Sequence, residues 1–314
     1  LTSILVPIIL RFITCKSQSS KSYSSYTFKY PMFLVLLFLI GIFAIGEEKK
    51  DSVKYWNIKN NILLNSEQST LSNWSAGGYS SFAFSSFYKG FYNYKKGNNQ
   101  WDNSVELAYG MIWQDKTGNG FKDPSNEFQK SDDKIELNSI YSRKMIKSWN
   151  YSVLMNLKSQ FDEGFKDGNL VSAPLSPITI TSSVGWEYKN KGFSAMLSFL
   201  AGKTTIVTDN RLRGNEIFGF TDIGQCALFS LGSYAKFFYQ KDIFKNVNLL
   251  VKLDLFYDYH KPLLDTDINT EVFINIKVSK YLTAFINFQA IMDKDFNSTL
   301  QYKQRFGLSV PISF

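Results

Sequence analysis

Large apolar side chains alternate with polar or small ones along most of the chain after about residue 60. The run Val247–Tyr257 carries an apolar residue at every odd position, and residues 306–314 alternate in the same way. A period of two gives a strand one apolar and one polar face. Many runs exceed ten residues, whereas a tilted strand crosses lipid in about 9–11. The pattern therefore predicts strands that cross a membrane.

The predicted connections between these strands come in two sizes. Residues 190–192 and 279–280 are tight turns, whereas residues 115–130 and 163–177 are long, polar and rich in Gly, Asp and Asn. Short turns on one rim and long loops on the other are typical of outer-membrane barrels. A soluble β-sandwich also alternates, but with shorter strands.

We therefore predict an all-β fold, a single antiparallel transmembrane β-barrel in the cell outer membrane. About eleven strands can be read from residue 77 onward, and single-chain bacterial barrels have even numbers. A further strand within residues 58–70 gives 12, which we prefer. Merging one weak pair gives 10, the alternative.

An apolar run precedes the barrel pattern. Residues 32–46 have the form of a signal peptide, with Ala44 and Gly46 at the small-residue positions before a cleavage site. The alternative is a membrane anchor that is never cleaved. Residues 1–31 show no coherent pattern and are interpreted as an over-extended start or a disordered stretch. Residues 47–76 are then an N-terminal extended segment or a first strand, and residues 77–314 are the barrel.

The charge balance and the cysteines narrow the list of partners. The chain has 35 basic and 27 acidic residues, a net charge of +8. Four basic residues and no acidic ones lie before residue 47, which leaves 31 against 27, or +4, for the predicted mature chain. No dense basic cluster with interleaved aromatics indicates nucleic acid. Cys15 lies in the predicted leader region and Cys226 is alone after it, so the mature chain has no partner for a disulfide.

The C-terminus has the form of a membrane-assembly signal. Its apolar positions are Phe306, Leu308, Val310, Ile312 and Phe314. The expected partners are outer-membrane lipid and the barrel-assembly machinery. Pro311 interrupts this strand by removing a hydrogen-bond donor where the barrel has to close, and the pattern does not explain it.

The polar face of the predicted strands carries charges of both signs. The lumen-lining polar residues are Glu106, Glu136, Lys158, Lys252, Asp254, Glu271 and Lys277. A narrow lumen lined in this way is either a small-solute conduit or a channel closed by paired charges. Bulky residues fall on the same face, namely Ile140, Leu154, Leu250, Phe256 and Phe273, and their size favours the closed form.

Two further patterns carry candidate chemistry. His260 is the only histidine and follows Asp254 and Asp258, so a hydrolase at the barrel rim is conceivable, although no serine is specified by spacing. Residues 115–126 resemble half of a calcium loop, with oxygens at Asp115, Thr117, Asn119 and Asp123. Position 12 of that loop is Asn126, where a calcium loop has a bidentate Glu, so a polar loop tip is favoured over a metal site.

Several stretches of the sequence together carry a resemblance to a known family. The most specific is residues 64–78, LNSEQSTLSNWSAGG. The weaker stretches are Trp56, residues 101–103, 109–110, 130–137, 149–152, 158–161, 175–177, 203–205 and Asp209. Together these stretches resemble an outer-membrane barrel family of Bacteroidetes carried as a domain of unknown function. The resemblance implies a barrel in the outer membrane and brings no catalytic residue, cofactor or substrate.

Three function classes remain open from the sequence. The first is a small-solute conduit, and the second is a plugged structural or assembly barrel that binds other envelope proteins through its long loops or N-terminal segment. The third, ranked well behind, is the rim hydrolase that would use His260. We expect no catalytic site, no cofactor and no nucleic-acid partner.

Overall fold

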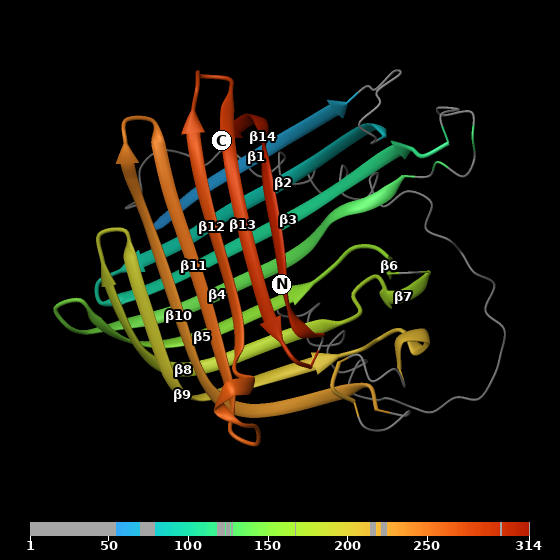
Figure 1. Ribbon diagram of the computed structural model, residues 1–314. Coiled ribbons are helices and arrows are strands. Elements are labelled where there is room, and N and C mark those ends of the chain that lie inside the picture. Colours follow the sequence, from blue (N-terminus) through green and yellow to red (C-terminus); the bar gives the residue numbers. More distant parts are fainter. Residues whose placement is uncertain are drawn as a thin grey trace.

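The chain folds into a closed antiparallel β-barrel of twelve strands (Figure 1). The computed structural model describes residues 55–69, 79–117, 123, 126, 128–166, 168–213, 218–220, 225–295 and 297–313. The predicted fold class and the preferred count of 12 strands are confirmed. The predicted signal peptide, residues 32–46, lies outside the described residues, as do residues 1–31, Trp74 and Phe314.

Each barrel strand pairs with its neighbours in the order β1-β2-β3-β4-β5-β8-β9-β10-β11-β12-β13-β14, and β14 returns to β1. The strands are β1 (Trp56–Ser69), β2 (Ser80–Lys96), β3 (Asn99–Asp115), β4 (Gln129–Ile146), β5 (Trp149–Ser159), β8 (Ile178–Asn190), β9 (Phe193–Ile206), β10 (Ala227–Phe244), β11 (Val247–Asp258), β12 (Asp267–Lys277), β13 (Thr283–Asp293) and β14 (Asn297–Ser313). β1 lies within residues 47–76, the segment for which an extended N-terminal stretch or a first strand was expected.

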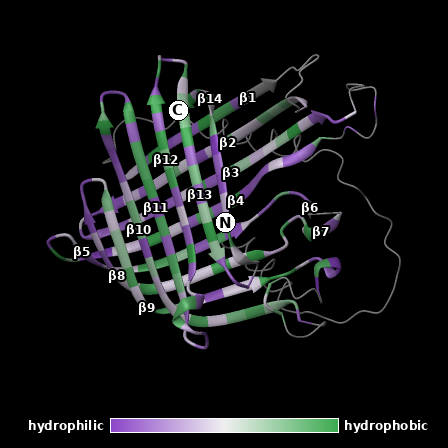
Figure 2. Ribbon diagram, in the orientation of Figure 1, coloured by the Kyte–Doolittle hydropathy of each residue, from purple (hydrophilic) through white to green (hydrophobic). Residues whose placement is uncertain are grey.

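Side-chain exposure follows the alternation in the sequence. In β5, Tyr151, Val153 and Met155 are each about half exposed, whereas the intervening Ser152 and Leu154 are buried. The same banding of hydrophobic and hydrophilic positions runs along the other strands (Figure 2). The exposed set faces outward as an apolar belt and the buried set faces the lumen. A closed, even-stranded antiparallel barrel with such a belt is an outer-membrane protein.

Among the described residues, no helix is long and apolar enough to cross a membrane.

The two rims of the barrel differ as predicted. Two to five residues join the strands at one rim, which we call the short-turn rim. The other rim, the long-loop rim, carries residues 160–177, 207–226 and 259–266 among its connections. The first of these loops contains a feature that the sequence did not reveal, a small hairpin of β6 (Gly164–Lys166) and β7 (Asn169–Ser172).

The barrel closes over a short seam between the first and last strands. The pairing of β1 with β14 runs from Asn61 opposite Ser313 to Asn65 opposite Ser309. Figure 1 shows the two strands crossing near the C-terminus and diverging from there. Pro311 lies inside this seam, opposite Leu63. The proline therefore does not prevent closure, but the seam is much shorter than the pairing of β1 with β2, which extends over 14 residues.

One aromatic residue is covered at a position typical of an exposed ring. Trp113 lies near the end of the alternating run of β3, where a barrel places a girdle of rings at the membrane surface, but only 6% of it is exposed. Its indole N–H donates to the backbone oxygen of Asn126 at 2.8 Å, so the loop after β3 covers it. The alternation places a side chain on a face, but it does not predict that a loop folds back over that face.

A bulge in β9 shows how tightly adjacent strands approach. The pairing of β9 with both neighbours shifts next to Phe199 and Leu200. Ser198 compensates for part of this disruption, because its hydroxyl accepts the Leu200 N–H and lies 2.8 Å from the Val184 oxygen. Gly185 and Gly232 flank the bulge on β8 and β10, where a side chain would collide with backbone oxygens.

Replacing Gly232 with alanine should destabilise the barrel. The new Cβ would lie 1.9 Å from the Tyr257 oxygen on β11, so the backbone has to shift. We expect a loss of about 1–3 kcal/mol, the usual range for overpacking. The measurement is the urea midpoint of the folded band in heat-modifiable electrophoresis. Ser182→Ala, at an exposed position on β8, is the control. Equal midpoints for the two variants would contradict this account of the bulge.

Candidate functional site

The middle of the lumen holds six charged side chains, three of each sign. We call them the lumen ion network: Lys89 on β2, Glu106 on β3, Lys134 and Glu136 on β4, Lys252 on β11 and Glu271 on β12. All six are largely buried. Their charges balance within the network, as buried ionised groups require.

Glu106 is the centre of this network. One carboxylate oxygen lies 2.8 Å from Lys89 Nζ and 2.6 Å from Lys252 Nζ, and the other lies 3.0 Å from Lys134 Nζ. Lys134 also contacts Glu136 at 2.8 Å. Three lysines on three strands thus converge on one carboxylate.

The network crosses the lumen. In the closed ring of twelve strands, β3 and β11 are separated by five strands on either side, and so are β4 and β12. The Glu106–Lys252 pair joins the first two strands, and Lys134 lies 3.9 Å from Glu271 across the second two. Two side chains that meet from opposite walls fill the width of the lumen at this height.

Amides complete the hydrogen bonding of the network. Asn156 donates to one Glu136 oxygen at 3.0 Å and to the Asn138 side chain at 2.8 Å. Lys252 donates to Glu271 at 3.3 Å. Separating charged groups that keep several partners in a low dielectric costs several kcal/mol of free energy.

A second ion cluster lies beside the network. Asp254 on β11 accepts from Lys236 Nζ at 2.8 Å and from the Tyr234 hydroxyl at 2.7 Å. Lys158 on β5 approaches the same carboxylate to 3.7 Å. This cluster connects three strands on the β5–β11 side of the lumen.

Ion pairs continue toward the long-loop rim. Lys203 on β9 lies 2.7 Å from both Asp267 on β12 and Asp293 on β13. On the other side, Lys303 and Arg305 of β14 each lie 2.6 Å from Asp132 of β4. These contacts also join strands that are not neighbours in the ring.

Ion pairs also occur in the short-turn half of the lumen. Lys189 on β8 contacts Asp102 on β3 at 2.6 Å and Glu187 at 3.1 Å. Glu187 is 2% exposed and accepts hydrogen bonds from the hydroxyls of Ser142 and Ser152. Only two strands separate β8 from β3 in the ring, so this pairing joins nearby parts of the wall and not opposite ones.

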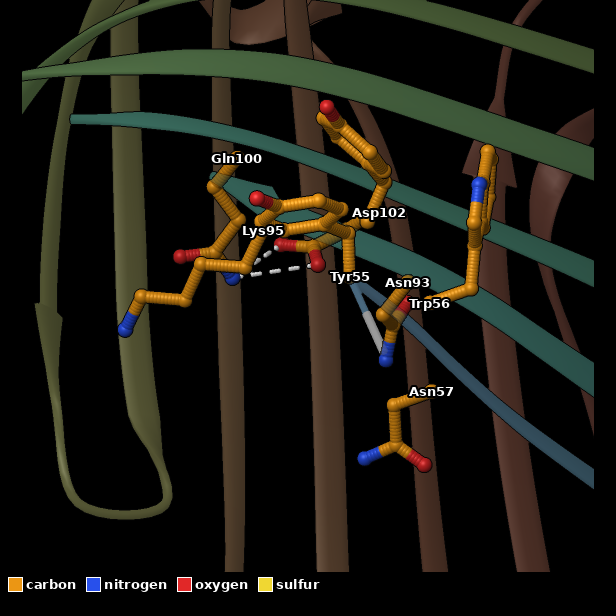
Figure 3. Close-up of a pocket in the computed structure, with 8 residues that line it drawn as sticks. Tyr55, Trp56, Asn57, Asn93, Lys95, Gln100 and Asp102 are labelled. Atoms are coloured by element: carbon orange, nitrogen blue, oxygen red, sulfur yellow. Dashed lines mark hydrogen bonds between the residues drawn. The ribbon is translucent and has the colours of Figure 1, made fainter. Parts of the chain in front are cut away.

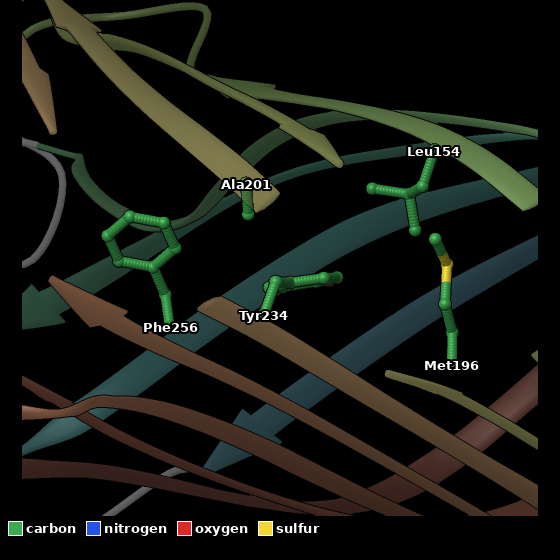
Figure 4. Close-up of a cluster of buried hydrophobic side chains, with 5 residues drawn as sticks. All are labelled: Leu154, Met196, Ala201, Tyr234 and Phe256. Atoms are coloured by element: carbon green, nitrogen blue, oxygen red, sulfur yellow. The ribbon is translucent and has the colours of Figure 1, made fainter. Parts of the chain in front are cut away.

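The lumen also contains an apolar cluster. Its buried members are Leu154, Met196, Ala201, Tyr234 and Phe256, from β5, β9, β10 and β11 (Figure 4). Ile140 packs against it. The cluster fills part of the lumen that the charged side chains leave, and its Tyr234 hydroxyl links it to Asp254.

The structure brings together six of the seven lumen residues named from the sequence. Glu106, Glu136, Lys252 and Glu271 belong to the lumen ion network, and Lys158 and Asp254 lie beside it. Lys277 does not join them, because it ends β12 at the short-turn rim and is exposed there.

Sequence reasoning missed three lysines that these carboxylates need. Lys134 is two residues from Glu136 and could have been found from alternation alone. Lys89 and Lys236 could be found only from strand register, which places Lys89 opposite Glu106 and Lys236 opposite Asp254.

Two hollows open at the short-turn rim. One, of about 420 Å³, is lined by Tyr55, Trp56, Asn57, Asn93, Tyr94, Lys95, Gln100 and Asp102. Figure 3 shows the Gln100–Asp102 hydrogen-bonded pair close to the Tyr55 ring, with Asn57 and Asn93 below them. The other, of about 490 Å³, is lined by Asp242, Asn246, Asn248, Asn275, Lys277, Lys280, Thr283 and Pro311. The carboxylate of the first hollow is already neutralised by Lys189.

His260 lies at the long-loop rim with 81% of its side chain exposed. Its Nδ1 lies 3.3 Å from Asp258, which also interacts with Ser230. The carboxylate is thus between the serine and the histidine, whereas nucleophile activation needs the histidine between them. The contacts around His260 do not supply an activated nucleophile.

The candidate calcium loop is held by an amide. The Asn126 side chain donates to Asp115 at 2.8 Å and to the Thr117 hydroxyl at 3.0 Å. Asn119 lies outside the described residues, and Asp123 is within them. No group of three or more His, Cys, Asp or Glu residues in the described part of the chain is arranged to hold a metal. The amide does the bridging that a cation would do.

The predicted assembly-signal residues are on the outer face of β14. Phe306 is 70% exposed, and Leu308, Val310 and Ile312 are about half exposed. Phe314 lies outside the described residues. This orientation is what contact with lipid requires.

Two long loops pack into a cap at the long-loop rim. Ala173, Val207, Leu212, Phe218 and Phe220 form its buried apolar cluster. At its surface, hydrogen bonds from Arg211 hold the pKa of the Asp209 carboxyl below its ordinary value. The same arginine also binds Glu163 of the preceding loop at 2.5 Å.

Comparison with known proteins adds a family resemblance over part of the chain. Residues 66–165 match the family described as protein of unknown function (DUF3078). This confirms the resemblance to a domain of unknown function and says nothing about lineage. No curated protein matches the chain.

The solved structures with similar folds include outer-membrane barrels. An outer-membrane channel from Pseudomonas putida F1 has a TM-score of 0.39 at 9% identity, over 85% of this chain and 100% of that one. Outer-membrane phospholipase A from Escherichia coli has a TM-score of 0.34 at 11% identity, over 86% and 96%. The translocator domain of an autotransporter from Neisseria meningitidis has a TM-score of 0.28 at 9% identity, over 92% and 99%. These similarities carry no argument about activity.

Removing the central carboxylate should strongly destabilise the barrel. Glu106→Ala leaves three lysines beside one another in the lumen, and breaking buried ion pairs from one side costs about 3–5 kcal/mol. The measurement is the urea midpoint of the folded protein in detergent micelles. Lys277→Ala, at the exposed end of β12, should change it by less than about 0.5 kcal/mol. A Glu106→Ala midpoint equal to that of Lys277→Ala would show that the network contributes little.

Proposed function

We propose that this protein is a closed outer-membrane barrel that serves the envelope as a structural or assembly barrel, not as a solute conduit. The observation that carries the proposal is the Glu106–Lys252 pair, which joins opposite walls of the lumen at 2.6 Å. The conduit reading of the mixed-charge lumen is the alternative. Charges of both signs fit either reading, and it is their pairing across the lumen that favours the closed one.

Ion pairs occur on both sides of this level as well. The lumen ion network joins opposite walls in the middle, whereas Lys189 with Asp102, and Lys203 with Asp267 and Asp293, join strands that have only two or three strands between them and narrow the lumen toward its ends. A solute would have to separate the pairs that join opposite walls. Each separation leaves charges poorly solvated at a cost of several kcal/mol, so passive flow is strongly opposed.

The surfaces that remain for function are the two rims. At the long-loop rim, the apolar cluster under residues 160–177 and 207–226 gives the cap a core of its own. Large side chains stay exposed there, including Phe165 at 64% and Leu264 at 84%. Exposed apolar side chains at this rim support a role in binding other envelope proteins.

The test of closure is conductance in planar lipid bilayers. We expect the native protein to give no stepwise current. The double variant Glu106→Ala with Lys252→Ala removes the pair that joins β3 and β11 and should produce current steps, because two long side chains leave the level at which opposite walls are joined. Both proteins must show the heat-modifiable band of a folded barrel.

The matched control is Asp242→Ala with Lys277→Ala, which removes the same two charges from the short-turn rim. This control variant should give no current steps. Regular current steps from the native protein, equal to those of the Glu106 and Lys252 variant, would refute the closed barrel and restore the conduit.

A further inference from the structure

The short-turn rim carries basic side chains that take no part in the lumen pairing. One lysine lies at each of its five hairpin connections, namely Lys96, Lys147, Lys191, Lys245 and Lys280, and all five are exposed. None of the five forms an ion pair with an acidic residue in the described part of the chain. Each connection also has at least one further Lys or Arg within four residues. We call these five lysines the basic ring.

The opposite rim does not share this property. There, Lys203, Lys261 and Lys294 each bind an aspartate. These three lysines are thus neutralised by aspartates, whereas the five lysines of the basic ring are not. Exposed lysines without acidic partners give this rim a positive potential that attracts anionic groups.

Large exposed apolar side chains accompany the basic ring. Ile146, Phe244 and Tyr281 are 63%, 71% and 69% exposed, and each is the immediate chain neighbour of a ring lysine. Phe193 follows Lys191 by two residues and is 37% exposed. Lys280 Nζ lies 5.4 Å from the centre of the Tyr281 ring.

An apolar side chain beside a lysine is the arrangement of a membrane-interface anchor. The apolar group enters the region between headgroups and acyl chains, and the ammonium reaches the phosphate level. An anionic polymer or an acidic protein in water would explain the lysines but would leave the apolar neighbours in water. A lipid leaflet explains both.

We propose that the basic ring is a binding site for anionic phospholipids in the leaflet that surrounds the short-turn rim. Lysine ammonium groups bind the headgroup phosphates, and the adjacent Ile146, Phe244 and Tyr281 side chains lie among the first acyl carbons. In single-chain bacterial outer-membrane barrels the short turns face the periplasm, so the leaflet is the periplasmic one.

The experiment measures which lipids remain bound to the full-length protein. The protein is reconstituted in nanodiscs of equal parts phosphatidylglycerol and phosphatidylcholine. Native mass spectrometry then identifies the lipids that stay bound and gives their ratio. We expect phosphatidylglycerol to be enriched about fivefold, from about 1 kcal/mol for a basic residue near an anionic leaflet. High salt should reduce the enrichment, because it screens exposed charges.

The variant Lys147→Gln, Lys191→Gln, Lys245→Gln should lose most of this enrichment. Its matched control is Lys116→Gln, Arg211→Gln, Lys294→Gln, which removes the same charge from the exposed surface of the long-loop rim and should keep it. Heat-modifiable mobility establishes that both variants are folded.

Three results would overturn the proposal: no enrichment in the native protein, equal loss in the two variants, or an enrichment unchanged by the ring substitutions. A parallel sedimentation assay with purified cell-wall sacculi addresses the competing partner. Ring-dependent sedimentation without a phosphatidylglycerol preference would assign the ring to an anionic polymer instead. Because none of these measurements depends on conductance, the lipid site and the closed lumen succeed or fail separately.

Discussion

The absence of water from the bilayer interior is the constraint on which the rest of this structure depends. Every backbone N–H and C=O group at that depth needs a partner within the protein, and a closed ring of strands supplies one for each. The alternating pattern follows from the same constraint, because each strand separates lipid from lumen. The short seam of β1 with β14 serves the same purpose, because without it the sheet would present two open edges with unpaired backbone groups to hydrocarbon.

Closing the sheet creates a second problem inside it. A ring of twelve strands that carries ionisable residues on its inner face must solvate them or pair them. This protein pairs them, and it does so across the lumen as well as along it: Glu106 receives three lysines, and Asp132 receives Lys303 and Arg305 from β14. The apolar cluster around Leu154 and Phe256 fills much of what remains. The interior thus resembles the core of a soluble protein with ion pairs in place of many apolar contacts.

The two ends of the barrel have different chemistry because they meet different surroundings. The long-loop rim is built from loops that pack on one another, with a buried cluster under residues 160–177 and 207–226. The short-turn rim has too few residues in its connections to build such a cap. Its lysines extend outward from the turns, next to exposed apolar side chains such as Phe244. A cap favours specific contacts with a partner, whereas a ring of charged turns favours a continuous surface such as a leaflet.

The sequence by itself determined the class of fold, because a period of two is a property of consecutive residues and does not depend on tertiary contacts. It predicted twelve antiparallel strands, the unequal rims and the polar face that carries Glu106, Lys252 and Glu271. It did not show that a loop covers Trp113, and it did not reveal the β6–β7 hairpin, since a loop that folds over a strand leaves no periodic signal. It also could not show which charges meet. Lys252 and Glu106 are 146 residues apart, and only the closed ring, with its register and its number of strands, places them opposite each other. Alternation assigns each side chain to a face, whereas contact across the lumen depends on the whole circumference.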